Sequence, residues 1–190
     1  MLKLIRRLIF IFAFLILANV ACAKDEESIK GLRDAIVTLS PRVNPEEAEL
    51  ISLTAHTTSR SLAHEYRITG PPAFQNFLIH IGLRQRGYCF DFARDIGARL
   101  KELKPRTLVL HWGESFANTS EENNGLVVTA RGRPFRDGII IDAWRHGGRL
   151  YWRSVTEDRQ NEWEENMRES ALLQNERPTQ RKSQRTTAQR

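Results

Sequence analysis

The chain has 190 residues, enough for one medium-sized domain with terminal extensions. Its net charge of +6 lies at the two ends: residues 1–23 carry +3 and residues 171–190 carry +4, which leaves −1 for residues 24–170. A basic character of this origin gives no reason to expect that the folded part binds nucleic acid. The sequence shows no phosphate-binding glycine loop, no zinc-binding cysteine cluster and no internal repeat, so we expect neither a cofactor nor a metal ion.

Residues 1–23 have the three-part layout of a secretory signal peptide. A short basic start precedes the apolar run Leu8–Leu17, and Ala21-Cys22-Ala23 supplies the small residues of a cleavage site. The apolar run is shorter than the roughly 20 residues that span a bilayer. We therefore predict cleavage after Ala23 and a periplasmic or envelope location. An uncleaved membrane anchor and a lipoprotein carrying its lipid on Cys22 remain alternatives.

Cleavage would remove Cys22 and leave Cys89 as the single cysteine. No disulfide could then form within the chain, although an exported protein would permit one. A lone exported thiol is either protected by burial or has a function.

The N-terminal half of the domain has helical patterns. Residues 24–40 place apolar side chains at helical spacing, and Pro41 ends that pattern. Asn44-Pro45-Glu46-Glu47 is typical of a helix start, with a cap, a proline at the first position and acidic residues in the first turn. After the break at Gly70-Pro71-Pro72, residues 73–83 form a third helical run.

The stretch around Cys89 predicts an amphipathic helix with this cysteine in its first turn. Its apolar positions recur every three or four residues: Cys89, Phe92, Ala93, Ile96, Leu100 and Leu103. A thiol in the first turn feels the positive end of the helix dipole, which favours the thiolate and so a nucleophilic cysteine. The alternative is a buried cysteine that fills a small core space.

After Pro105 the pattern changes to strands. Four candidates follow, at residues 107–112, 125–131, 138–142 and 149–155. Helices followed by an antiparallel meander predict an α+β fold in which the cysteine helix packs on a small sheet.

The C-terminal segment is predicted to lie outside the domain. Trp163 and Met167 could seat a short helix, but residues 174–190 have no apolar period and too little apolar surface to offset their ordering entropy. We therefore predict a single domain over residues 24–160 and a polar basic tail over residues 161–190, largely disordered.

Three features of the sequence resemble the core of transglutaminase-like and papain-like cysteine proteins. They are Gly87-Tyr88-Cys89 at a helix start, a strand near residue 125, and Ile141-Asp142-Ala143-Trp144 at the end of the next strand. The likeness covers about residues 78–155. Uncharacterised bacterial envelope proteins resemble the same core. The resemblance implies thiol chemistry on an amide, either hydrolysis or acyl transfer, with a cysteine, a histidine and an aspartate in that order.

The chain departs from this pattern where the family histidine should enter the strand. Asn124 occupies that position, and an amide cannot take a proton near neutral pH. Either the site is inactive or another histidine acts. His111, at the end of the neighbouring strand, is the preferred substitute, and His146 in the turn after Asp142 is the second choice. Asp142 would orient the histidine.

Two functions remain open. The first is an exported cysteine hydrolase or acyl transferase that uses Cys89, His111 and Asp142, with backbone N–H groups at the helix start holding the oxyanion. The second is a catalytically inactive relative that serves as an envelope binding or structural protein. The expected partner is a peptide, a protein or a peptidoglycan stem, and membrane contact could come through lipidated Cys22 or the basic tail.

Overall fold

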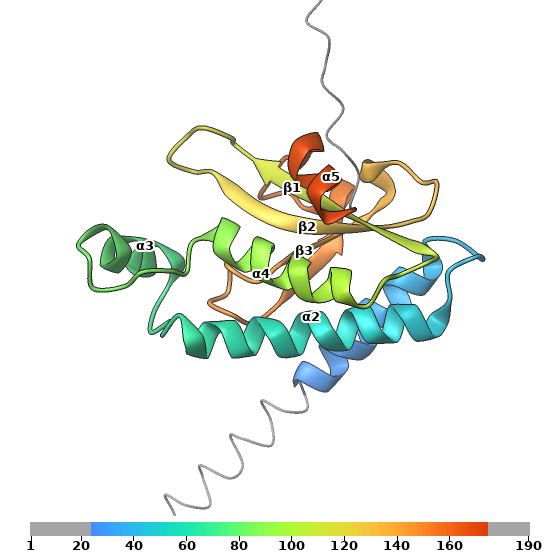
Figure 1. Ribbon diagram of the computed structural model, residues 1–190, viewed down its shortest axis with the longest axis horizontal. Helices are drawn as coiled ribbons and strands as arrows, with labels where there is room; N and C mark the ends of the chain where they lie inside the picture. The colour runs from blue at the N-terminus through green and yellow to red at the C-terminus, as the bar shows by residue number, and fades with distance from the viewer. Residues whose placement is uncertain (1–23, 175–190) are drawn as a thin grey trace, which may run out of the picture.

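The computed structural model describes residues 24–174 (Figure 1). The predicted signal peptide, Cys22 and the tail beyond residue 174 therefore lie outside the described residues. Helices cover residues 24–38, α2 (Pro45–Glu65), α3 (Pro72–His80), α4 (Cys89–Glu102) and α5 (Met167–Leu173). The strands are β1 (Leu108–Ser115), β2 (Asn123–Ala130), β3 (Ile139–Asp142), β4 (Tyr151–Ser154) and β5 (Glu164–Glu165), with short 3-10 turns at Phe135–Asp137 and Val155–Glu157. No helix within residues 24–174 is long and apolar enough to cross a membrane.

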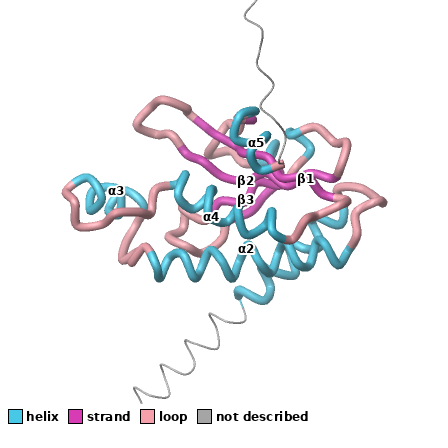
Figure 2. The backbone as a smooth tube through the Cα atoms, viewed as in Figure 1, coloured by secondary structure: helices cyan, strands magenta, loops and turns pink. Residues whose placement is uncertain are grey.

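The five strands form one antiparallel sheet in the order β4-β3-β2-β1-β5. Strands β1 to β4 are the predicted meander, because each pairs with the next along the chain. The predicted α+β fold is confirmed: all the described helices except α5 precede the sheet, and the cysteine helix packs on it (Figure 2).

The two faces of the sheet carry different cores, because alternate residues of a strand point to opposite sides. On one face Leu126 and Val128 of β2 join Phe92 and Ile96 of α4 in the main core. On the other face Val127 belongs to a smaller cluster, together with Phe135, Ile140, Val155 and Trp163. This alternation decides which side chains can reach the cysteine.

Helix α4 lies between the sheet and α2 (Figure 1). Its Gly97 faces Leu126 and Leu173, and a Cβ built there would meet Leu173 Cδ2 at 2.7 Å and Leu126 Cδ2 at 3.3 Å. Glycine at this position lets α4 approach β2 and α5 closely. Phe92 is only 1% exposed, and burial of such a side chain stabilises the fold by about 1.5–3 kcal/mol.

The start of α2 forms as its sequence predicts. The Asn44 side chain accepts a hydrogen bond from the Glu46 amide at 2.7 Å, which is the capping interaction. The Glu47 carboxylate accepts from the backbone N–H groups of Arg106 and Thr107. Burial alone would raise the pKa of Glu47, but its hydrogen bonds to Thr107 and Arg106 outweigh burial and hold this pKa below its usual value. These bonds tie α2 to the segment that enters β1.

The first helix is fastened through His56 of α2. Its Nε2 lies 2.9 Å from Ser28 Oγ, its Nδ1 lies 2.8 Å from the Ser52 carbonyl, and Trp152 Nε1 donates to Ser28 Oγ at 3.0 Å. Because Nδ1 faces a carbonyl and must donate, Nε2 accepts from the Ser28 hydroxyl. Burial lowers the pKa of His56, which agrees with a neutral ring used for packing.

The predicted domain boundary at residue 160 is wrong, because residues 161–174 belong to the domain. Trp163 is 3% exposed in the smaller core, and β5 pairs with the free edge of β1. Helix α5 then follows the same edge: Ser170 Oγ accepts from the Trp112 amide, and Gln174 Nε2 donates to the Leu110 carbonyl. These elements have two and seven residues, too short for a periodic pattern, and their stability comes from the strand edge that they cover.

Candidate thiol site

Cys89 is the first residue of α4 and so lies in the first turn, as predicted. The chain enters the helix through Gly87, whose φ of +122° favours glycine. A Cβ at Gly87 would also meet Gln75 Nε2 at 2.7 Å. Glycine is therefore required for this turn, and the turn directs the cysteine side chain towards the sheet.

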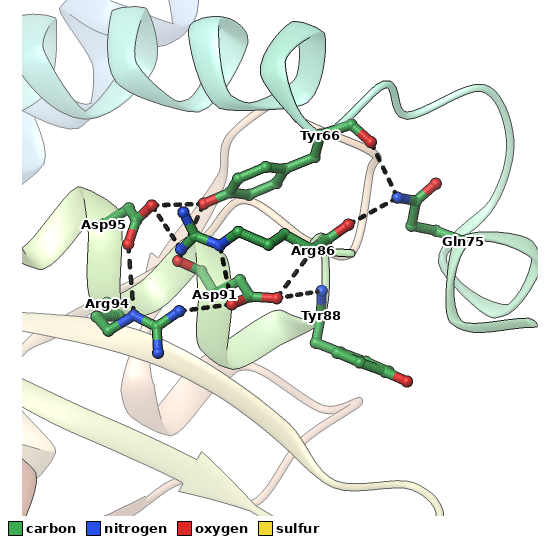
Figure 3. A network of polar contacts seen from close by, with 8 residues as sticks. Tyr66, Gln75, Arg86, Tyr88, Asp91, Arg94 and Asp95 are labelled. Atoms are coloured by element: carbon green, nitrogen blue, oxygen red, sulfur yellow. Dashed lines mark hydrogen bonds and ion pairs between the residues drawn. The ribbon is translucent and has the colours of Figure 1, made fainter. Parts of the chain in front are cut away.

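The start of α4 is held by the carboxylate of Asp91, in the first turn (Figure 3). It accepts hydrogen bonds from the N–H groups of Gly87 at 3.0 Å and Tyr88 at 3.2 Å. The Arg94 guanidinium lies 2.6 Å from the same carboxylate. An acidic side chain that binds the N–H groups preceding its own helix fixes the direction from which the chain enters.

A second set of contacts joins this turn to α2 and α3 (Figure 3). Arg86 Nη2 and the Tyr66 hydroxyl both lie 2.7 Å from Asp95 Oδ2. Burial, and then the hydrogen bond to Asp95, raise the pKa of Tyr66, so the phenol stays protonated and donates. Gln75 Nε2 donates to the carbonyls of Tyr66 and Arg86. The position of Cys89 is thus fixed by three helices.

The Cys89 thiol is buried and makes hydrogen bonds as a neutral group. It is 7% exposed, it donates to the Glu122 carbonyl at 3.7 Å, and it accepts from Asn124 Nδ2 at 3.6 Å. A thiolate has no proton to donate, and the partial negative charge of the carbonyl oxygen would repel it. This arrangement therefore favours the protonated sulfur.

The pKa of Cys89 reflects the same balance. Burial, the largest influence, raises the pKa above its usual value. The N–H groups of Asn124 and Phe90 act in the opposite direction without cancelling burial, and the charge of Asp142 adds a small rise. The prediction that the helix start would favour a thiolate is thus not supported here, because a buried sulfur loses more by desolvation than these donors return.

Asn124 is fixed in the place where the resemblance would put a histidine. Its Oδ1 accepts from Trp112 Nε1 at 2.7 Å, and its Nδ2 donates to Glu122 Oε1 at 2.9 Å as well as to the sulfur. Both ends of the amide have partners, so its orientation is determined. An amide held in this way can position a thiol but cannot accept its proton.

Asp142 lies at the end of β3, as predicted, but its contacts differ from those of a histidine-orienting group. Its carboxylate accepts from the backbone N–H groups of Trp144 and Arg145, from Arg145 Nε and from Asn123 Nδ2. These partners occupy the carboxylate oxygens. Asp142 therefore caps the turn after β3 and binds Arg145.

In a catalytic triad, one histidine contacts both the thiol and the carboxylate. Here Asn124 contacts the thiol and Asn123 contacts the carboxylate. Asn124 shares its side of β2 with Leu126 and contacts Cys89, whereas Asn123 lies on the alternate side and contacts Asp142. Within residues 24–174, no single side chain links the Cys89 sulfur to the Asp142 carboxylate.

His111 lies on the opposite face of the sheet from Cys89. It pairs with Val127 in the β1–β2 register, and its ring packs edge-on against Phe135, a member of the smaller cluster. Nδ1 lies 2.6 Å from Glu165 Oε1, and Nε2 lies 2.9 Å from Thr129 Oγ1. With both nitrogens engaged on the far face, His111 is not the base for Cys89 in this geometry.

His146 does not reach the cysteine either. It is exposed in the turn after β3 and packs against Tyr151, with ring centroids 5.7 Å apart. Burial and the charges of Arg149 and Arg145 lower its pKa. No hydrogen bond joins Cys89 to any of the five histidines, all of which lie within residues 24–174.

Two residues near the thiol were missed at the sequence level: Glu122, whose carbonyl accepts from the thiol, and Asn123. The cluster Glu121-Glu122-Asn123-Asn124 was visible, but only the β2 register shows which side each residue faces.

Two buried polar atoms of directly paired residues, Ser115 Oγ and Asn123 Oδ1, have no hydrogen-bond partner. Such atoms usually bind water or a ligand. Within residues 24–174, no group of His, Cys, Asp and Glu side chains could hold a metal ion.

No protein-family model, curated protein or solved structure matches this chain.

Proposed function

We propose that this protein is an exported, catalytically inactive relative of the transglutaminase-like and papain-like cysteine proteins, and that it serves as a binding or structural protein of the cell envelope. The observation that carries the proposal is the pair of hydrogen bonds at Cys89, whose thiol donates to a carbonyl and accepts from the Asn124 amide. A cysteine nucleophile needs a base to remove its proton, and no imidazole contacts this one.

The contacts of Asp142 support the same conclusion. Its four hydrogen-bond partners come from the turn after β3 and from Asn123. It does not orient a base, because the group beside it is the Asn123 amide. The unpartnered Ser115 Oγ and Asn123 Oδ1 would supply a hydroxyl and an amide oxygen to a bound amide-containing component.

The titration of Cys89 tests the inactive state. Iodoacetamide labelling of the folded protein, followed against pH, should reach half of its maximal rate above about pH 8.5, the value of an ordinary thiol. Cys89→Ser serves as the control for background labelling. Burial slows labelling at every pH, so the pKa is taken from the shape of the curve. Labelling that persists below pH 7 would restore the hydrolase and acyl-transferase hypothesis.

Export is tested separately, by mass spectrometry of the protein purified from its own cells. The layout of residues 1–23 predicts that the mature chain begins at Lys24. A diacylglyceryl mass on Cys22 would show a lipoprotein, which is also an envelope protein. A chain that retains Met1 and remains in the cytosol contradicts the proposed location.

A further inference from the structure

Helix α3 and the turn that follows expose a cluster of large apolar side chains. Phe74 is 44% exposed, Phe77 54%, Ile81 48% and Leu83 63%. Contiguous exposed apolar surface of this kind marks interaction sites in soluble proteins. We call these four residues the α3 patch.

The patch lies on one side of the helix. Phe74, Phe77 and Ile81 are spaced by three and four residues, and the two phenylalanine rings stack with centroids 6.5 Å apart. The opposite side holds the buried Gln75 and Leu78, which attach α3 to the rest of the protein. In Figures 1 and 2 the helix stands at one end of the molecule, away from the sheet. The patch therefore points outward with no segment of residues 24–174 covering it.

The segment that carries the patch, residues 66–90, has basic charges only, and the exposed Glu65 at the end of α2 is an acidic residue beside it that lines the same pocket as Leu83 and Arg84. Residues 66–90 contain no aspartate or glutamate, but they contain Arg67, Arg84, Arg86 and His80. Arg86 is paired with Asp95. Arg84 Nε donates to the Arg67 carbonyl, and neither of these two arginines forms an ion pair with a carboxylate of the described chain. Beside the apolar surface, Arg67 and Arg84 therefore have no ion-pair partner among residues 24–174, although Glu65 lies in the same pocket.

We propose that the α3 patch binds the surface of an anionic phospholipid bilayer, with Phe74 and Phe77 in the interface and Arg67 and Arg84 against the lipid phosphates. Aromatic and aliphatic side chains on one side of a helix, bordered by basic residues, are the composition of interfacial membrane helices. A second copy of the chain fits less well, because a two-fold contact would bring the same arginines of both copies together. This contact is independent of Cys89, of Cys22 and of the basic tail.

Co-sedimentation with vesicles tests the apolar part of the contact. The vesicles contain equal parts of phosphatidylcholine and phosphatidylglycerol, and every variant carries the same chain ends, so any binding through the ends is common to all. Phe74→Ser/Phe77→Ser should weaken binding at least tenfold, which corresponds to about 1.4 kcal/mol. Leu50→Ser/Leu53→Ser is the matched control, because these α2 residues have the same spacing and are 49% and 43% exposed. The control should bind like the wild type.

The basic part is tested with Arg84→Gln. It should weaken binding to the mixed vesicles about fivefold, and added salt should reduce this difference. The exposed Arg136 provides the control Arg136→Gln, which should have no effect. Circular dichroism verifies that each variant is folded.

Three results would overturn the proposal. The first is unchanged vesicle binding by Phe74→Ser/Phe77→Ser. The second is equal binding to vesicles of phosphatidylcholine alone, with no effect of Arg84→Gln. The third is a concentration-dependent dimer in analytical ultracentrifugation that Phe74→Ser/Phe77→Ser abolishes, which would make a second copy the occupant.

Discussion

Replacing Arg145 with methionine is expected to lower the free energy of unfolding by about 3–5 kcal/mol, because it leaves two buried carboxylates without their cation. The Arg145 side chain is 11% exposed and those of Asp142 and Asp158 are 0% and 1% exposed. Its Nη1 and Nη2 bind the two oxygens of Asp158, and its Nε binds Asp142. The guanidinium also lies over the Tyr151 ring, 4.0 Å from the centroid. One side chain thus joins the end of β3 to the segment that leads into β5.

Thermal unfolding measures the effect, and a loss of this size in a domain of this length lowers the midpoint by roughly 10 °C. Arg99→Met is the control. Arg99 pairs with Glu102, but the two side chains are 63% and 65% exposed, and an exposed pair contributes about 0–1 kcal/mol. A similar small change in both variants would show that the buried network contributes no more than the surface pair.

The pH dependence separates loss of charge pairing from loss of packing. Burial alone would raise the pKa of Asp158, but hydrogen bonds from Arg145 and Trp163 hold it below its usual value. In the wild type this group stabilises the fold above its unfolded pKa, and the contribution is lost as the pH falls through the folded pKa. Without Arg145, burial raises the pKa of Asp158, so the variant loses stability as the pH rises. The difference in unfolding free energy between the wild type and Arg145→Met should therefore be smaller at about pH 4 than at pH 7. An equal deficit at both pH values would indicate lost packing alone.

The sequence carried enough information for the helices and the meander because their signals are local. The cap at Asn44 and the apolar stripe of α4 each depend on residues that are close together in the sequence. The first turn of α4 could be predicted because Gly87 and the apolar stripe that follows it mark the helix start. The segment with β5 and α5 could not be predicted in the same way. Its partners are the Trp112 amide and the Leu110 carbonyl, more than fifty residues away.

The candidate site was less predictable than the fold, because its chemistry depends on which face of the sheet a residue occupies. His111 and Trp112 are neighbours in β1, yet the Trp112 side chain binds Asn124 beside Cys89 while His111 binds Glu165 on the other face. A shift of one residue in register would exchange these roles. Chain order therefore could not assign His111 to the cysteine. The network of Asp142, Arg145 and Asp158 was missed for a similar reason, since it joins residues from two turns.

Replacing Asn124 with histidine is expected to lower the pKa of Cys89, which burial holds above its usual value, to about 7. The Asn124 Nδ2 lies 3.6 Å from the sulfur, so an imidazole at this position would place a ring nitrogen near the thiol. Glu122 Oε1, which accepts from Asn124 at 2.9 Å, would accept from the ring and favour its charged form. The Trp112 indole donates towards the same position and opposes a fully protonated ring, so we expect a smaller change than in a complete catalytic triad.

Iodoacetamide labelling against pH measures this pKa, and the labelling rate provides a second readout. At pH 7 the thiolate fraction should rise from the small value of a buried thiol to about half, and this gain exceeds the loss of intrinsic reactivity that accompanies the lower basicity of the sulfur, so labelling at pH 7 should become faster. Asn124→Leu is the control and should raise the pKa of Cys89, because it removes the amide donors of the side chain. Glu122→Gln in the histidine variant should return part of the pKa change, since the ring then loses its carboxylate. If the histidine variant titrates like the wild type while remaining folded, Cys89 is a core residue held by its surroundings, and the turn at Gly87 serves packing alone.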